Sequence, residues 1–249
     1  MYLDIVELRD FYHDPLGTVA RRLIGQRVRS FWPVTSGMCV VGLGYAAPYL
    51  DVYAAEAQRA LALMPAAQGV VPWPAKGPFR SALVEEFDLP LPDASVDRLL
   101  MVHMLEMSEA PHHLLREAWR VLEPGGKLIV VVPNRRGMWA RLDTTPFGYG
   151  RPFSRGQLVK LFSDAMFQPE GWASALAMPP LRRRVLIRYA AALERFGRLA
   201  MPGFEGVLVA EASKRVLAPI KLAPARRLGA RLRPALSPPA TGASRASNG

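Results

Sequence analysis

The sequence predicts an α/β fold with a doubly wound, mostly parallel sheet. Short apolar runs alternate with segments of helical periodicity along most of the 249 residues. The runs that have the length and content of buried strands lie at 38–41, 60–64, 81–84, 97–102, 127–132 and 207–210. Strands that alternate with helices form a parallel sheet covered on both faces, and ligands bind beyond the carboxyl ends of its strands.

An N-terminal helical segment, residues 1–36, precedes the first strand. Apolar residues recur at spacings of three and four over residues 4–30, with Pro15 as a break, which predicts one or two helices. The first strand then ends in a glycine turn, and Pro48 suits the first turn of the next helix. The four prolines between residues 65 and 80 argue against a regular helix after the second strand.

The later helices carry clearer end signals. A helix over 110–122 ends at Pro124-Gly125-Gly126, and Ser154 with Gln157 is a capping box for the next helix. A basic helical insertion over 180–203 is expected before the last strand. We therefore place the main domain at 37–215 and a basic, disordered tail at 216–249.

Charge divides the chain unevenly. The net charge is +11, but residues 1–150 hold 15 Lys and Arg against 16 Asp and Glu, whereas residues 151–249 hold 17 against 5. A basic C-terminal part suits nucleic acid, anionic lipid or an acidic partner, and it also suits a solvated tail.

Several classes of protein are disfavoured. An apolar run of about 18 residues, which a membrane span requires, is missing, and Asp4 and Glu7 do not suit a secretory signal, so we expect a cytoplasmic protein. The single cysteine, Cys39, cannot form an internal disulfide. His112 and His113 are adjacent and lack acidic companions, so we expect no metal site.

Two stretches carry the functional signal. Gly42-Leu43-Gly44-Tyr45-Ala46 lies between a predicted strand and a predicted helix, where glycines let a ligand approach the backbone; a tight packing turn is an equal alternative. The second stretch runs from Glu85-Glu86-Phe87-Asp88-Leu89-Pro90 through Val102-His103 to Arg120-Val121-Leu122-Glu123-Pro124-Gly125-Gly126-Lys127-Leu128. This series resembles the methyltransferase type 11 family of class I, S-adenosylmethionine-dependent enzymes.

The resemblance implies a Rossmann-like sheet of seven strands and a set of cofactor contacts. Gly42, Gly44 and Ala46 match the loop that touches the amino-acid part of S-adenosylmethionine. Glu85, with Glu86 beside it, matches the acidic residue that receives the adenine amino group. Val102 and His103 match positions near the sulfonium and the methyl acceptor. The tips of the first, third and fourth strands are then expected to converge on a cleft for the cofactor.

Candidates on the acceptor side are His103 as a catalytic residue and Asn134 and Tyr149 as substrate contacts. A core valine and a capping histidine are the structural alternatives for Val102 and His103. The stretch 144–153, rich in glycine and aromatic residues, is a candidate lid or simple surface structure.

The chain departs from the family pattern in two places. Val40 stands where the family has an acidic residue, and the second strand ends in Met64-Pro65, without the carboxylate that binds the ribose hydroxyls. Two hypotheses of function follow. One is a methyltransferase with an unidentified acceptor, and the other is a catalytically weak or inactive relative that binds RNA, ribosome or protein through its basic C-terminal half.

Overall fold

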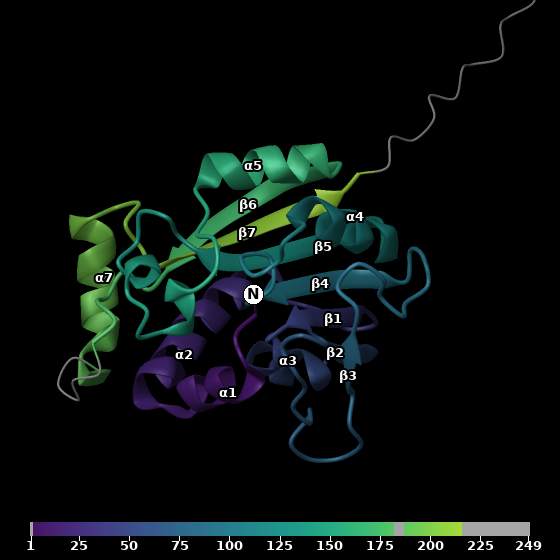
Figure 1. Cartoon of the computed structure of the whole chain (residues 1–249), viewed down its shortest axis with the longest axis horizontal. Helices are drawn as coiled ribbons and strands as arrows, with labels where there is room; N and C mark the ends of the chain where they lie inside the picture. The colour runs from purple at the N-terminus through teal and green to yellow at the C-terminus, as the bar shows by residue number, and fades with distance from the viewer. Residues whose placement is uncertain (1, 182–186, 216–249) are drawn as a thin grey trace, which may run out of the picture. The chain divides into compact units, whose positions relative to one another are not determined.

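A seven-stranded mixed sheet is the framework of the chain (Figure 1). The computed structural model describes residues 2–181 and 187–215. Met1–Val216 cluster as one compact unit. The strands are β1 (Cys39–Gly44), β2 (Arg59–Pro65), β3 (Ser81–Val84), β4 (Val96–Val102), β5 (Leu122–Pro133), β6 (Phe167–Ala175) and β7 (Val207–Lys214). The helices are α1 (Ile5–His13), α2 (Pro15–Phe31), α3 (Ala47–Ala54), α4 (Pro111–Val121), α5 (Arg155–Asp164) and α7 (Ala190–Ala200), with short 3₁₀ turns η1 (Trp139–Arg141) and η2 (Pro146–Gly148).

The strand order is β3-β2-β1-β4-β5-β7-β6. The first five strands pair in parallel, and β7 runs antiparallel to both β5 and β6. The predicted fold class is therefore confirmed. The direction of the chain across the sheet reverses between β1 and β4, which is where ligands of such sheets usually bind.

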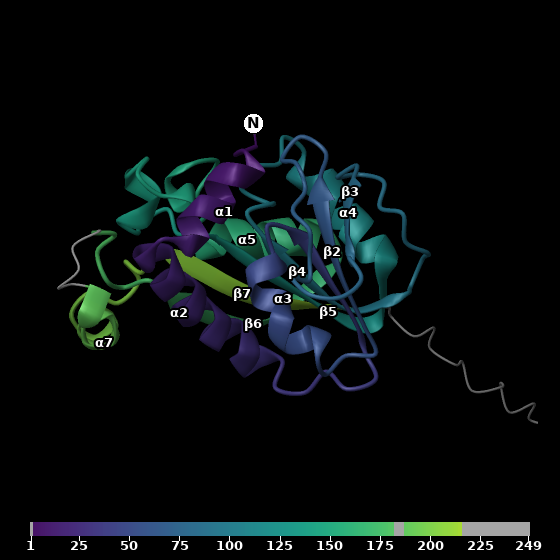
Figure 2. The same cartoon turned by 90° about the horizontal axis from the view of Figure 1, so that it is seen from below.

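Helices cover both faces of the sheet, as Figures 1 and 2 show. Helices α1, α2 and α3 lie on one face, where their apolar residues form a core with alternate residues of the strands. Helices α4 and α5 pack on the other face and bury residues such as Leu114, Leu115 and Phe162. Strand residues that alternate in direction supply both cores, as the sequence pattern requires.

The helix starts follow the signals in the sequence, whereas the predicted stop signal Pro124-Gly125-Gly126 lies within β5, because α4 ends at Val121. Asp4 caps α1 by accepting a hydrogen bond from the Val6 N–H at 2.7 Å, and Pro15 occupies the first turn of α2. Both hydrogen bonds of the predicted capping box, between Ser154 and Gln157, are present at the start of α5. Among the described residues no helix is long and apolar enough to cross a membrane.

One strand is absent from the set located in the sequence. Strand β6 reads FQPEGWASA, so Pro169 and Gly171 interrupt its pairing and most of its residues are only half-buried. It is one of the two edge strands of the sheet, and it lacks the continuous apolar run that marks the other strands.

The predicted helical insertion contains α7, which directly precedes β7. In the predicted basic insertion, Arg188 is exposed. The described residues do not include Arg182, Arg183 and Arg184, nor the predicted tail 216–249. The domain boundaries at 36 and 215 stay predictions.

Arg120, the first residue of the last family motif, ties α4 to the loop that follows β3. Its guanidinium donates to the carbonyls of Leu89 and Leu91 and to the carboxylates of Asp93 and Glu117 at 2.6–3.0 Å. The Glu117 carboxylate in turn accepts the Leu89 N–H at 2.7 Å. The motif therefore has a structural role in holding this loop against α4.

Candidate functional site

The predicted glycine turn, residues 42–46, is only partly a turn, because Gly42 and Gly44 belong to β1 and Gly44 pairs with Val102 at the end of β4. Gly44 has φ +79°, and a Cβ on this residue would lie 2.4 Å from the Val102 carbonyl oxygen. A Cβ on Gly42 would lie 2.6 Å from the Leu50 side chain of α3. The close packing of β1 against α3 and β4 therefore requires glycine at both positions, even in the absence of a ligand. Ala46 is buried at the start of α3.

His103 follows β4 in a strained backbone conformation. Its φ of +50° lies in the left-handed region, which a non-glycine residue rarely adopts, and its side chain is completely buried. Its Nε2 lies 2.9 Å from the Tyr12 hydroxyl, and its Nδ1 lies 3.3 Å from the Glu106 carboxylate. The Phe147 ring packs on it with a centroid distance of 4.8 Å.

A buried polar chain therefore runs from α3 through α1 to the loop after β4. The Tyr49 hydroxyl donates to the Tyr12 hydroxyl at 3.0 Å, and Tyr12 contacts His103, which contacts Glu106. Burial raises the pKa of Tyr12 and of Tyr49 well above the ordinary value for tyrosine. If Tyr12 donates to Nε2, then Nδ1 carries the imidazole proton and faces the Glu106 carboxylate at 3.3 Å, without forming a hydrogen bond to it.

The chain itself covers the tips of the strands. The Gln68 side chain, which follows β2, donates to the His103 carbonyl at 3.3 Å and so reaches across to the backbone after β4. The Tyr2 hydroxyl donates to the Glu86 carboxylate, after β3, and lies 3.7 Å from the Met104 sulfur. We call these two side chains, Tyr2 and Gln68, the strap.

The expected open cleft is therefore not seen in the described residues. The apolar face of α1 is buried against the carboxyl ends of β1 and β4. Its buried residues are Ile5, Leu8, Phe11 and Tyr12. Ile5 also donates its backbone N–H to the Gln68 carbonyl at 2.9 Å. Hydrophobic burial of the N-terminal helix thus fills the space above the glycine turn.

Glu85 and Glu86, the two residues predicted to lie near the adenine, differ in their exposure to solvent. Glu85 is exposed at the end of β3, whereas Glu86 is half-buried by its hydrogen bond with Tyr2. The second strand ends at the buried Met64 and at Pro65, so its tip offers no carboxylate to a ribose. Trp73, from the proline-rich stretch, lies in the core and donates its indole N–H to Asp51 of α3 at 2.9 Å.

The two predicted substrate residues lie apart. Asn134 is buried at the end of β5, and its amide bonds the carbonyls of Gly203 and Glu205 and the N–H of Arg136, which ties β5 to the turn before β7. Tyr149 is exposed and lines two cavities beside α1.

Tyr2, Tyr12, Gln68 and Glu106 contact the predicted residues Glu86 and His103 but were not themselves predicted as site residues. The periodicity of α1 indicates that Tyr12 is buried, but it cannot indicate what covers it. The described residues contain no group of three or more His, Cys, Asp or Glu side chains that could hold a metal ion.

Comparison with known proteins gives a consistent picture of the family. A model of the methyltransferase domain matches residues 40–130, which contain the glycine turn and strands β2 to β4. A "Probable S-adenosylmethionine-dependent methyltransferase" of Mycolicibacterium smegmatis is 36% identical over 85 residues, and one of Mycobacterium tuberculosis is 35% identical over 97 residues. These matches cover 33% and 38% of this chain, and the matched parts span about a third of the relatives, 33% and 35%.

Solved structures share the fold over most of the chain. A methyltransferase of Thermotoga maritima, titled a possible histamine N-methyltransferase, has a TM-score of 0.56 at 18% identity and covers 85% of this chain and 96% of its own. The [4+2]-cyclase SpnF has a TM-score of 0.55 at 22% identity and covers 80% of this chain and 82% of its own. Identities this low support the fold alone. A model of the methyltransferase domain therefore matches residues 40–130 of this chain, and the sheet shares its fold with solved methyltransferase structures.

Proposed function

We propose that the chain is an S-adenosylmethionine-dependent methyltransferase with an acceptor still to be identified. The observation that carries the proposal is the family match, because it spans the glycine turn and the tips of β2, β3 and β4. S-adenosylmethionine supplies a methyl group on a sulfonium that is already activated, so the protein's task is chiefly to orient the acceptor and exclude water.

The residues that would hold this cofactor fit it only in part. The backbone of Gly42, Gly44 and Ala46 would face its amino-acid part, and Glu85 would face the adenine from the exposed rim of β3. Pro65 offers nothing to the ribose hydroxyls. In the described conformation the strap and α1 cover the space between these groups.

Binding therefore requires the strap to leave the strand tips. A protein that must open before it binds has an apparent affinity lowered by the fraction of open molecules. We expect micromolar affinity, because the missing ribose carboxylate and the cost of opening both weaken binding.

His103 is the proposed residue nearest the acceptor. Tyr12 and Glu106 lie on either side of its ring, and these contacts hold His103 in its left-handed conformation directly after β4. Both ring nitrogens have neighbours, so His103 can accept a proton from a substrate only after Tyr12 has moved away from Nε2. Tyr49 and Tyr12 would then be positioning residues.

Titration calorimetry of the full chain with S-adenosylmethionine and with S-adenosylhomocysteine tests the proposal. Heat of binding at micromolar concentrations is the expected result. The variant Glu85→Ala should weaken binding about tenfold, because a charged hydrogen bond to the adenine is lost. Glu123→Ala, an exposed acid on β5, is the matched control. Absence of heat with both compounds at millimolar concentration would contradict the proposal.

The second candidate is a methyltransferase-fold protein that binds RNA, ribosome or another acidic partner. The covered strand tips and Pro65 favour it, and the basic residues after position 150 would supply the contacts. Fluorescence anisotropy with single-stranded RNA should then show an affinity that falls steeply with salt. Deletion of residues 216–249 should reduce that affinity and its salt dependence, and an unchanged affinity would argue against this candidate.

A further inference from the structure

Two adjoining cavities lie between α1 and the segment that follows β5. The first, of about 380 Å³, lies between α1 and the segment 143–149, and the second, of about 890 Å³, extends to the loop after β4. Leu3, Glu7 and Tyr149 line both of them, so we treat the pair as one feature, the α1 groove. Their volumes lie within the range of small-molecule sites.

The α1 groove is acidic in a basic protein. The chain has 21 Asp and Glu residues and a net charge of +11. Among the described residues that line the groove, Arg151 is the one basic residue, whereas the acidic ones are Asp4, Glu7, Asp10, Asp14, Glu106, Glu109 and Asp143. Carboxylates concentrated along one concave surface raise the local concentration of cations.

Two buried polar groups in the groove lack partners. The Glu106 side chain is fully buried, and neither of its carboxylate oxygens has a hydrogen bond, although Oε1 lies 3.3 Å from the His103 Nδ1. The Thr145 hydroxyl, in a residue that is 2% exposed, also has no hydrogen-bond partner. Buried polar groups are almost always satisfied, so an unpartnered carboxylate and an unpartnered hydroxyl in one groove point to a ligand that donates hydrogen bonds.

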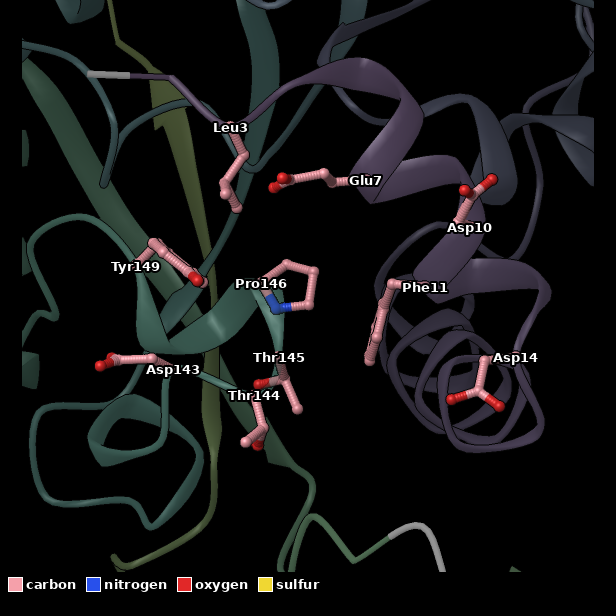
Figure 3. A pocket seen from close by; sticks show the side chains of 10 residues that line it. All are labelled: Leu3, Glu7, Asp10, Phe11, Asp14, Asp143, Thr144, Thr145, Pro146 and Tyr149. Carbon is pink, nitrogen blue, oxygen red and sulfur yellow. The ribbon is translucent and has the colours of Figure 1, made fainter.

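The walls of the groove also provide apolar and aromatic surface. Figure 3 shows the Phe11 ring opposite Pro146, with Thr144 and Thr145 continuing the Pro146 wall. In the same view Glu7 and Tyr149 extend toward each other from opposite sides. Carboxylates beside aromatic rings are the combination that binds organic ammonium groups, through charge and through cation–π contact.

We propose that the α1 groove binds a small aliphatic amine in its ammonium form, with two or more charged nitrogens. Glu7, Asp10 and Asp143 attract the charges, and Glu106 and Thr145 accept hydrogen bonds from the buried end of the ligand. The groove adjoins His103 through Glu106, which places the amine on the acceptor side of the site. Naming this amine as the methyl acceptor rests on the proposed function, whereas its binding does not.

Titration calorimetry of the full chain with spermidine, without S-adenosylmethionine and at about 150 mM salt, tests the proposal. Spermidine should bind, and tetraethylene glycol, an uncharged chain of similar length, should not. The triple variant Glu7→Gln, Asp10→Asn and Asp143→Asn should weaken spermidine binding at least about fivefold, because three exposed carboxylates of the groove are removed without loss of volume.

A matched control distinguishes binding in the α1 groove from nonspecific attraction of spermidine to acidic residues elsewhere on the surface. The triple variant Asp88→Asn, Glu123→Gln and Asp164→Asn removes three exposed acids outside the groove and changes the net charge equally. Its spermidine affinity should stay within about twofold of the unmodified chain. Thr145→Val should weaken binding about threefold through loss of one hydrogen bond.

The outcomes separate the two proposals. Equal weakening in both triple variants, or no heat at about 5 mM spermidine, overturns the amine site. Spermidine binding that depends on the groove, in a chain that binds no S-adenosylhomocysteine, supports the amine site while the proposed methyltransferase function fails. Binding of S-adenosylhomocysteine without any spermidine binding overturns the amine site and supports the methyltransferase function.

Discussion

At the scale of single residues, the glycines of the turn and the buried tyrosines carry the clearest physical constraints. Gly44 has a positive φ and lies in close contact with the backbone at the end of β4. The fold itself therefore requires glycine at this position, independently of any ligand. Tyr12 joins the N-terminal helix to His103 through a buried hydrogen bond. Each of these features makes a separate prediction.

Gly44→Ala should destabilise the fold more than its positive φ alone would explain. The new Cβ would lie 2.4 Å from the Val102 carbonyl oxygen, so β1 and β4 must move apart. We expect a loss of about 2–4 kcal/mol in the free energy of unfolding, measured by urea titration. Gly125→Ala is the control, because Gly125 also has a positive φ but nothing lies within 4 Å of its Cβ position. Its loss should be about 1 kcal/mol, and equal losses in the two variants would show that close approach is unimportant.

Tyr12 and Tyr49 should make the fold sensitive to alkali. Burial raises the pKa of both phenols in the folded state, so the stability they contribute is complete below the ordinary tyrosine pKa of about 10 and is lost as the pH rises above it. Tyr12→Phe should reduce the alkaline slope of unfolding free energy by up to about 1.4 kcal/mol per pH unit. Tyr189→Phe, at an exposed position, is the control. Urea titrations at a series of pH values between about 8 and 11 provide the measurement, and identical slopes would contradict the assignment.

At the scale of elements, every helix and strand except β6 corresponds to a pattern that is visible in the sequence. Apolar runs form the strands, caps begin α1 and α5, and Arg120 joins α4 to the loop after β3. The proline-rich connection between β2 and β3 replaces a helix, and Trp73 anchors it to α3. Arg120 makes several hydrogen bonds through one guanidinium, so a single substitution tests its role.

Arg120→Met should lower the free energy of unfolding by about 2–4 kcal/mol. The substitution keeps the aliphatic stem but removes the donors to Leu89, Leu91 and Asp93, and it leaves the Glu117 carboxylate mostly buried without its cation. Arg116→Met, on an exposed position of the same helix, should change stability by less than about 0.5 kcal/mol. Chemical denaturation of both variants provides the measurement, and a small loss in both would mean that Arg120 does not hold the loop.

At the scale of the whole molecule, the N-terminal segment and the sheet cannot be considered separately. Tyr2 and Glu86 are 84 residues apart in the chain, and Gln68 and His103 are 35 apart, yet both pairs meet over the strand tips. The same α1 that covers these tips forms one wall of the acidic groove. Opening of the strap and occupation of the groove should therefore influence each other.

Removing the strap should favour cofactor binding. In the double variant Tyr2→Ala, Gln68→Ala the hydrogen bonds to Glu86 and to the His103 carbonyl are gone, so opening requires less free energy. We expect the affinity for S-adenosylhomocysteine to rise about threefold to tenfold by titration calorimetry. The double variant Tyr189→Ala, Gln168→Ala alters an exposed tyrosine and an exposed glutamine elsewhere and serves as the control. An unchanged or lower affinity in the strap variant would show that the strap does not oppose binding.

Sequence alone determined the fold class, six of the seven strands and the main helix ends. Those features depend on local patterns, such as the β-branched run of β5 or the Ser154 capping box, that are visible within a dozen residues. Strand β6 was not predicted because an edge strand interrupted by Pro169 and Gly171 has no such pattern.

Only the tertiary structure decided what lies over the strand tips and what lines the groove. The periodicity of α1 says that Tyr12 is buried, but not that its hydroxyl meets His103. Likewise Glu7, Glu106 and Tyr149 come from three distant parts of the chain, and their shared cavity exists only once the helix has packed against the sheet. Side-chain contacts over such separations depend on the arrangement of whole elements, which local sequence patterns do not record.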